Sequence, residues 1–110
     1  MVTIDSIDTK DIHEIVVNGE IDASSSIHLD NALEKAFNNY KSILINLEDL
    51  KYISSAGLGV FIARLEEMKE KEVKMVLFGL NDKVKNVFAI LGLGELLTIK
   101  QDKQEALELF

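Results

Sequence analysis

Two adjacent serines, Ser54 and Ser55, are followed by the small residues Ala56, Gly57 and Gly59. An apolar stripe of helical spacing begins just after the serines, so they lie at the start of a predicted helix. A hydroxyl there can cap the helix by accepting a hydrogen bond from a backbone N–H, or it can be left exposed for modification. Capping is the ordinary role and stabilises a protein by about 1 kcal/mol.

The presence of glycines at the start of a helix requires a physical explanation, because glycine weakens a helix by roughly 1 kcal/mol relative to alanine. One reason is an open surface: small side chains at 56, 57 and 59 would let the backbone of a partner, or the active site of a kinase, reach the Ser55 hydroxyl. The other reason is tight packing of the helix against a sheet. Both reasons can hold at once.

The elements that would position these serines alternate between strand and helix. Runs of β-branched and apolar residues predict strands at residues 3–8, 12–17, 42–47, 73–78 and 96–99. Apolar residues at every third or fourth position predict helices at residues 24–40, 58–71, 81–91 and 102–110. We expect Gly19 to end the second strand and Gly92 to end the third helix.

Polar residues at the predicted helix starts are candidate caps. Asp22, or one of the serines after it, suits the first helix, and Asn81 or Asp82 suits the third. Asp102 and Glu105 form a capping pair for the terminal helix. That helix is expected to pack into the core, rather than to dock a partner, through its apolar residues Leu107, Leu109 and Phe110, with exposure of Phe110 at the very end as the alternative.

This alternation indicates a single α/β domain over residues 1–110, with a mixed, mostly parallel sheet and about four helices. Each helix supplies the crossover that parallel strands need. The first two strands, joined by a short turn at residues 9–11, are expected to be antiparallel. Functional loops in such sheets follow the carboxyl ends of the strands. The expected site is therefore the loop that follows residues 42–47 and leads to Ser54 and Ser55.

The charge balance argues against nucleic acid as a direct partner. Acidic side chains number 19 against 12 basic ones, and the formal net charge is −7, whereas a phosphate backbone requires a basic stripe. The chain has no cysteine, its first residues lack the pattern of a signal peptide, and no apolar stretch reaches the roughly 18 residues of a membrane span. We therefore expect a cytoplasmic protein that does not enter a membrane.

Catalysis is not expected from these residues. The chain has no Gly-x-x-x-x-Gly-Lys phosphate loop, and neither glycine pair, at 57/59 or at 92/94, continues into a dinucleotide fingerprint. The two histidines, His13 and His28, lack obvious acidic or thiolate companions for a triad or a metal site. We therefore expect no enzyme activity, no metal and no cofactor, and a role in binding other proteins.

Longer strings in the sequence carry a resemblance to a known family. Leu47-Glu48-Asp49-Leu50, followed by Tyr52-Ile53-Ser54-Ser55-Ala56-Gly57-Leu58-Gly59-Val60, resembles the signature of STAS domains, the family of anti-sigma factor antagonists. Gly19-Glu20-Ile21-Asp22-Ala23 resembles the second block of that family. The order of strands and helices matches over essentially the whole chain, so the resemblance implies a STAS-like fold.

The resemblance also implies a regulated serine. In that family an anti-sigma factor that is also a kinase phosphorylates the serine two positions before the glycine of the signature, which here is Ser55. The unmodified protein binds the anti-sigma factor and releases the sigma factor, and phosphorylation reverses this. The commonest signature has an aspartate where this chain has Ser54, which is a secondary candidate for modification. The residues implied on the partner-binding surface are Glu20, Asp22, Ser24, Ser54, Ala56, Gly57, Leu58 and Gly59.

The implied partners are an anti-sigma factor with serine kinase activity and a phosphatase, and the chain itself is expected to be a monomer or a weak dimer. A second role is compatible with the same resemblance. Some STAS proteins are scaffolds, or subunits of sensory or lipid-transport complexes, without phosphorylation, and a fold alone does not decide between roles. A mass shift at Ser55 after incubation with candidate serine kinases and ATP would favour the switch over the scaffold.

Overall fold

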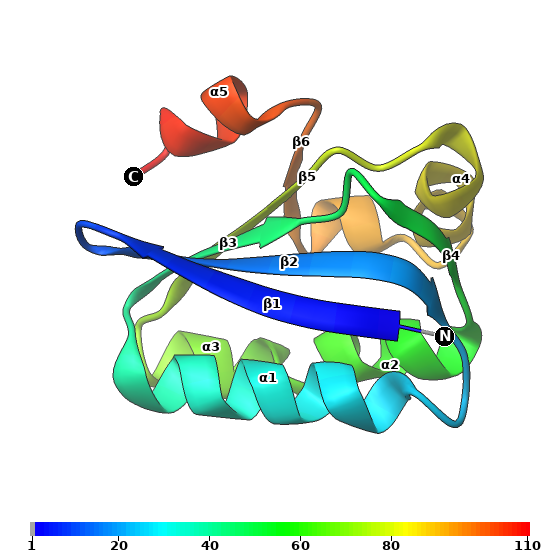
Figure 1. Cartoon of the computed structure of the whole chain (residues 1–110), viewed down its shortest axis with the longest axis horizontal. Coiled ribbons are helices and arrows are strands. Elements are labelled where there is room, and N and C mark those ends of the chain that lie inside the picture. The colour runs from blue at the N-terminus through cyan, green and yellow to red at the C-terminus, as the bar shows by residue number, and fades with distance from the viewer. Residues whose placement is uncertain (1) are drawn as a thin grey trace.

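A sheet of six strands runs through the computed structural model, which describes residues 2–110 (Figure 1). The strands are β1 (Val2–Thr9), β2 (Ile12–Ile21), β3 (Ser42–Asn46), β4 (Leu50–Ile53), β5 (Lys74–Phe78) and β6 (Thr98–Lys100). Their order is β1-β2-β3-β5-β6, and β4 pairs with β2 outside this path. β1 runs antiparallel to β2, and the other neighbours are parallel. The predicted mixed, mostly parallel sheet is therefore confirmed.

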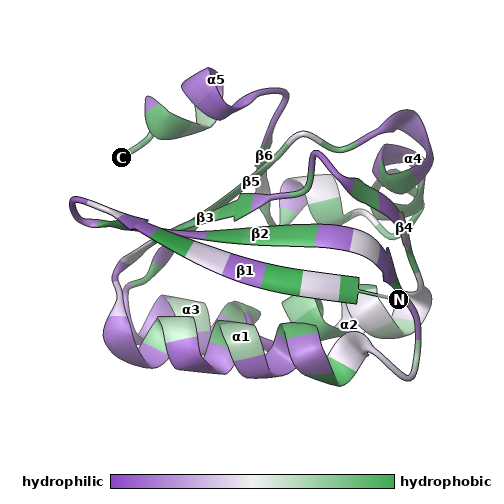
Figure 2. Cartoon of the chain, viewed as in Figure 1, coloured by the Kyte–Doolittle hydropathy of each residue, from purple (hydrophilic) through white to green (hydrophobic). Residues whose placement is uncertain are grey.

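Helices cover both faces of this sheet. They are α1 (Ser26–Asn39), α2 (Ser55–Ala63), α3 (Leu65–Glu70), α4 (Asp82–Ile90), the short 3₁₀ helix η1 (Leu93–Glu95) and α5 (Lys103–Leu107). In Figure 1, α1, α2 and α3 lie together below the sheet, and α5 lies above it. In Figure 2, α1 carries hydrophilic residues along the side turned away from the sheet, as its predicted amphipathic stripe requires.

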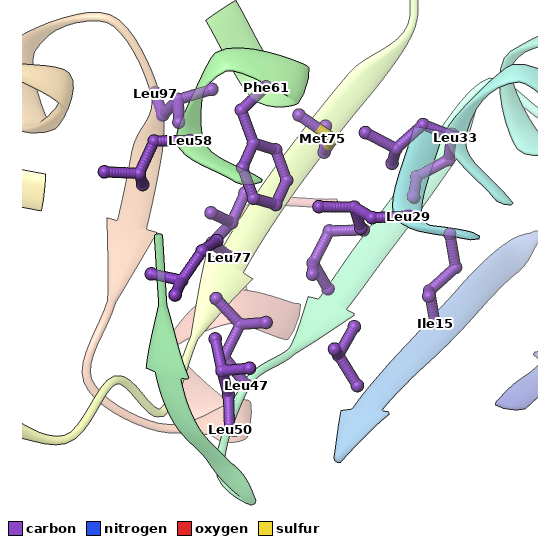
Figure 3. Close-up of a cluster of buried hydrophobic side chains, with 14 of the residues drawn as sticks. Ile15, Leu29, Leu33, Leu47, Leu50, Leu58, Phe61, Met75, Leu77 and Leu97 are labelled. Carbon is purple, nitrogen blue, oxygen red and sulfur yellow. The ribbon is translucent and has the colours of Figure 1, made fainter. Parts of the chain in front are cut away.

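Side chains alternate between the two faces along each strand and so supply two cores of unequal size. Ile43 and Ile45 of β3 join the larger core below the sheet, whereas Leu44 between them joins the smaller core under α5. Figure 3 shows the larger core, in which Leu29 of α1 and Phe61 of α2 lie over the strands. The larger core fixes α2, the helix that begins with the predicted site, against the sheet.

The smaller core corrects one expectation about the C-terminus. Of the residues of α5, only Ala106 is fully buried in the smaller core. Leu109 and Phe110, which follow α5, are partly buried and pack against this core, whereas Leu107 is 39 % exposed. The prediction that Leu107 belongs to the core is wrong. A helix of five residues presents little more than one turn to the sheet, so most of its side chains face solvent.

β2 continues past Gly19, although that glycine was expected to end it. Gly19 has φ +99°, which a glycine adopts without steric cost, and the register of β2 shifts between Gly19 and Glu20. Before this irregularity β2 pairs with β3, and from Gly19 to Ile21 it pairs with β4. The glycine therefore lets one strand serve two partners.

β4 was not predicted, because the segment after β3 was interpreted as a loop. It has only four residues, and the outer two, Leu50 and Ile53, are buried while Lys51 and Tyr52 are exposed. So short a strand shows no repeating alternation in the sequence. Its position at the end of β2 is set by tertiary pairing.

The helix predicted from 58 to 71 is two helices, α2 and α3, with Arg64 between them. The backbone N–H of Arg64 donates to the carbonyl of Phe61, three residues back, which interrupts the α-helical pattern. The Arg64 side chain, 14 % exposed, donates to Asp30 of α1 at 3.0 Å and to Glu67 at 2.7 Å. These carboxylates raise the pKa of Arg64, so the cation stays charged and ties α1 to the helix junction.

Other helix boundaries follow their predicted caps. Asn81 accepts a hydrogen bond from the Val84 N–H at 2.8 Å, and Asp102 accepts one from the Glu105 N–H at 2.9 Å. Gly92, with φ +68°, follows the end of α4 as predicted. Asn81, not Asp82, is therefore the cap of α4.

Gly57 offers a test of how closely α2 approaches the sheet. A Cβ atom built on Gly57 would lie 2.7 Å from Ile53 Cγ1 and 2.8 Å from Ile21 Cγ2, inside van der Waals contact with two fully buried side chains. We predict that Gly57→Ala lowers the free energy of unfolding by about 1–2 kcal/mol, because overpacking costs more than the helix propensity gained. Urea denaturation of the variant and the wild type measures the difference.

Gly59→Ala is the matched control, because a Cβ atom at Gly59 meets no atom within 4 Å. It should leave the protein equally stable, or up to about 1 kcal/mol more stable, since alanine favours the helix. Equal stability of the two variants would contradict the packing reason for Gly57.

Candidate functional site

The predicted site lies where β2 and β4 end side by side. The two strands are parallel, Ile21 is in register with Ile53, and the Ser54 N–H donates to the Ile21 carbonyl at 2.8 Å. Asp22 follows Ile21 on one segment, and Ser55 follows Ser54 on the other. Two segments whose paired residues Ile21 and Ile53 lie 32 positions apart in the sequence therefore leave the same end of the sheet together (Figure 1).

The two serines have separate roles in this geometry. Ser54 is the N-cap of α2: its backbone is extended, and its Oγ accepts a hydrogen bond from the Gly57 N–H at 3.3 Å. Ser55 is the first residue of the helix and is exposed. Within residues 2–110 no hydrogen bond engages the Ser55 hydroxyl. The capping role thus belongs to Ser54, and the Ser55 hydroxyl is accessible.

The small residues after the serines do not all reach the surface. Ala56 is exposed and Gly59 is half-buried, whereas Gly57 is buried and Leu58 is 0 % exposed. The expectation that Gly57 and Leu58 lie on the partner-binding surface is therefore wrong. Gly57 serves the packing of α2 on Ile21 and Ile53, and Leu58 fills the larger core, as Figure 3 shows.

Asp22 organises the segment between β2 and α1. Its Oδ1 atom accepts hydrogen bonds from the N–H and the Oγ of Ser24, at 3.0 and 2.7 Å, and from the N–H and the Oγ of Ser25, at 2.9 and 3.0 Å. These bonds, first the one from the Ser24 hydroxyl, lower the pKa of Asp22 to about 2. Ser25, rather than Asp22 or Ser24, occupies the N-cap position of α1, so the helix begins at Ser26.

The remaining predicted residues of the surface lie around this pair of segments. Glu20 and Ser24 are exposed, and Glu20 is in register with Tyr52 of β4. Tyr52 itself was not among the predicted site residues; it is 40 % exposed, with Lys83 Nζ 5.8 Å from the centre of its ring. Because β4 was not predicted, the sequence did not indicate that the Tyr52 side chain faces solvent and the Ile53 side chain faces the core.

One histidine does have an acidic companion, contrary to expectation. His13 Nδ1 lies 2.5 Å from Asp8 Oδ1, Tyr40 donates to Asp8 Oδ2 at 3.0 Å, and the rings of His13 and Tyr40 stack with centres 4.0 Å apart. The hydrogen bond with His13 is the main cause that lowers the pKa of Asp8. This cluster ties the β1–β2 hairpin to the end of α1, and β4 and α2 contribute nothing to it.

Within residues 2–110, no group of three or more His, Cys, Asp or Glu side chains is arranged to hold a metal ion. None of the helices described combines the length and the apolar character needed to cross a bilayer.

Comparison with known proteins gives the chain a family. The model of the STAS domain matches residues 3–106. An anti-sigma-B factor antagonist from Listeria monocytogenes is 36 % identical over 93 residues, which are 84 % of this chain and 82 % of that protein. The corresponding protein of Staphylococcus aureus is 28 % identical over 90 residues, which are 81 % of this chain and 83 % of that protein.

Solved structures share the fold. The crystal structure of an anti-sigma factor antagonist from Mycobacterium paratuberculosis has a TM-score of 0.89 at 18 % identity, and the alignment covers 99 % of this chain and 93 % of that one. The phosphorylated form of the Bacillus cell fate determinant SpoIIAA has a TM-score of 0.70 at 21 % identity, covering 98 % and 97 %. With the matched segment spanning nearly every element described above, the chain belongs to the STAS domain family.

Proposed function

We propose that this protein is an anti-sigma factor antagonist whose binding to an anti-sigma factor is ended by phosphorylation of Ser55. The observation that carries the proposal is the exposed Ser55 hydroxyl, which begins α2 without a hydrogen bond inside residues 2–110. The names of the Listeria and Staphylococcus relatives support the antagonist role. The existence of a phosphorylated form of SpoIIAA, on the same fold, supports the modification.

A phosphate on Ser55 is compatible with the fold. The first turn of α2 leaves backbone N–H groups that no helical carbonyl satisfies, and the helix dipole places partial positive charge there. A phosphate adds about −1.5 to −2 charges and strong acceptor oxygens, which suit such a position. Because Ser54 already provides the cap, modification of Ser55 removes no bond that α2 needs.

The same phosphate disfavours the complex. A kinase that transfers a phosphoryl group to Ser55 has to bring the phosphates of its nucleotide close to that hydroxyl. After transfer, the phosphoserine would face the nucleotide remaining in the kinase, and it would lie beside the segment that carries Asp22 and Glu20. Like charges held together in a closed interface cost free energy, since they lose water without gaining a partner. The modified protein therefore leaves the anti-sigma factor.

This role requires no catalysis by the chain itself. The partners are an anti-sigma factor with serine kinase activity and a phosphatase that removes the phosphate. The surface that they share consists of the exposed residues Glu20, Asp22, Ser24, Ser55 and Ala56 and the half-buried residues Ser54 and Gly59.

The first test locates the modified hydroxyl. The purified protein is incubated with ATP and the anti-sigma factor of the same bacterium, and intact-mass and peptide spectra are recorded. We expect one phosphate on Ser55, none on Ser55→Ala, and full modification of Ser54→Ala. Ser54→Ala should also unfold with about 1 kcal/mol less free energy, because it loses the cap of α2.

Modification of Ser55→Ala with loss of modification in Ser54→Ala would move the site to Ser54. Binding of the anti-sigma factor without modification of either serine would favour the scaffold role instead.

The second test separates charge from folding. Ser55→Asp places a carboxylate at the start of α2, where the helix dipole favours it, so the melting temperature should change by no more than about 2 °C. Binding of the anti-sigma factor, measured by calorimetry, should weaken at least tenfold. Ser55→Ala is the neutral control and should bind as the wild type does. A large drop in melting temperature for Ser55→Asp would contradict the proposal.

A further inference from the structure

The outer edge of β1 presents backbone groups that have no strand to pair with. β1 is the first strand in the order of the sheet, so only β2 pairs with it, and Figure 1 shows no strand on its other side. Antiparallel neighbours bond through every second residue, so alternate residues along the length of β1 direct their N–H and C=O groups away from β2. Within residues 2–110 no strand receives those groups.

The usual protections of a sheet edge are missing from β1. Its pairing with β2 runs from Val2–Gly19 to Thr9–Ile12 without a register shift, so no bulge twists the edge away. The strand contains neither proline nor lysine. The opposite edge strand, β6, has only three residues, and such a short strand is itself a protection. β1 is therefore the edge at which a further strand can pair.

A groove, the β1–α1 groove, follows this edge on the side of α1. It has a volume of about 1010 Å³, and its walls are β1 and one flank of α1. The residues of that flank recur at helical spacing and are exposed: His28, Asn31, Lys35 and Asn38. A strand added to β1 would direct every second side chain toward this flank, where the groove leaves room for it.

Acidic side chains outnumber basic ones along the groove. Asp5, Asp8 and Glu34 line it, against the single lysine Lys35. Asp8 and Glu34 already accept hydrogen bonds from side chains of other elements. The exposed carboxylate of Asp5 forms no hydrogen bond or ion pair within residues 2–110. Asp5 is therefore free to pair with a cation from outside the chain.

The side chain of Ile7 lies on the same face of β1 as that of Asp5. Ile4 packs against the larger core, so Asp5 and Ile7 point to the opposite face of the sheet. Ile7 is 51 % exposed. A strand beside β1 would thus meet a carboxylate and, two residues along, an apolar side chain. Cross-strand pairs favour an opposite charge facing Asp5 and a β-branched residue facing Ile7.

We propose that the β1–α1 groove binds an extended, positively charged segment of another protein, which joins the sheet as a strand beside β1. The backbone of the segment bonds to the free edge, a lysine or arginine pairs with Asp5, and a β-branched residue two positions away covers Ile7. No residue of β4 or α2 lines the groove, so this inference is independent of the proposed function.

Charge decides against a second copy of this chain as the occupant. Two β1 strands side by side would bring the carboxylates of Asp5 and Asp8 from both copies to one edge, and like charges across strands are destabilising. Each copy also carries a net charge of −7, which opposes their approach.

The test uses a synthetic probe, the capped peptide Lys-Thr-Ile-Thr-Lys-Thr-Ile-Thr, titrated into the isotope-labelled full chain and followed by NMR. We expect saturable shifts of the amides of β1 and of the α1 flank, and slower hydrogen exchange at every second residue of β1. The same peptide with glutamate in place of both lysines should bind at least about tenfold more weakly. Binding outside the groove, or no binding of the lysine peptide at millimolar concentration, would overturn the proposal.

Methylation of the peptide backbone shows whether it binds as a strand. Two further peptides carry N-methyl groups, one on the odd residues and the other on the even residues. A strand paired along one edge uses only one set of its N–H groups, so one methylated peptide should lose binding and the other should keep it. An equal effect of both methylations would exclude an added strand.

Two variants place the peptide on the protein. Asp5→Asn should weaken binding of the lysine peptide about three- to tenfold, and Glu66→Gln, which removes an exposed charge from α3, should bind as the wild type does. Asn31→Trp fills the groove from an exposed position, so it should abolish binding and keep the melting temperature. Wild-type affinity of either variant would contradict the groove as the site.

Sedimentation of the protein without peptide checks the choice of occupant. We expect a monomer at the concentrations of the titration. A dimer that Asn31→Trp dissociates would show that β1 pairs with a second copy, and the proposed segment of another protein would be wrong.

Discussion

The parallel pairing of β2 with β4 is the constraint on which the site depends. Ile21 and Ile53, which are in register at the end of this pairing, are both fully buried, and the next backbone bond joins Ser54 to Ile21 at 2.8 Å. A backbone bond flanked by buried side chains is costly to break, because its polar groups would lose their partners away from water. Asp22 and Ser55 are therefore fixed next to each other although neither side chain is bonded to the other segment.

Two glycines allow the strands and α2 to meet in this arrangement, each for a different reason. Gly19 takes a positive φ at the point where β2 changes partner from β3 to β4, so the strand can shift its register without ending. Gly57 lacks the Cβ atom that would meet Ile21 and Ile53, so α2 can begin directly over the ends of the two strands. A backbone requirement and a packing requirement thus meet at one edge of the sheet.

Local patterns predicted the order of elements and the caps Asn81 and Asp102, because these depend on residues within a few positions of each other. They failed where distant parts of the chain decide. β4 is too short to show a pattern and exists through its pairing with β2. The break at Arg64 coincides with that side chain's bonds to α1, and the burial of Gly57 reflects contacts across 36 positions. Sequence alone also left open which serine is the cap, since either one can accept the bond.

The charge of the whole chain limits how a phosphate could act. A basic partner is already attracted by a net charge of −7, and a phosphate makes the chain still more acidic, so at long range modification would strengthen the attraction. The loss of binding proposed above would then have to arise at short range, where groups of like charge are covered together. The turn of residues 22–25 and the capped start of α2 are both held by bonds that do not involve Ser55. The surface therefore keeps its shape, and under the proposed function a partner would distinguish the two forms by the charge at the start of α2.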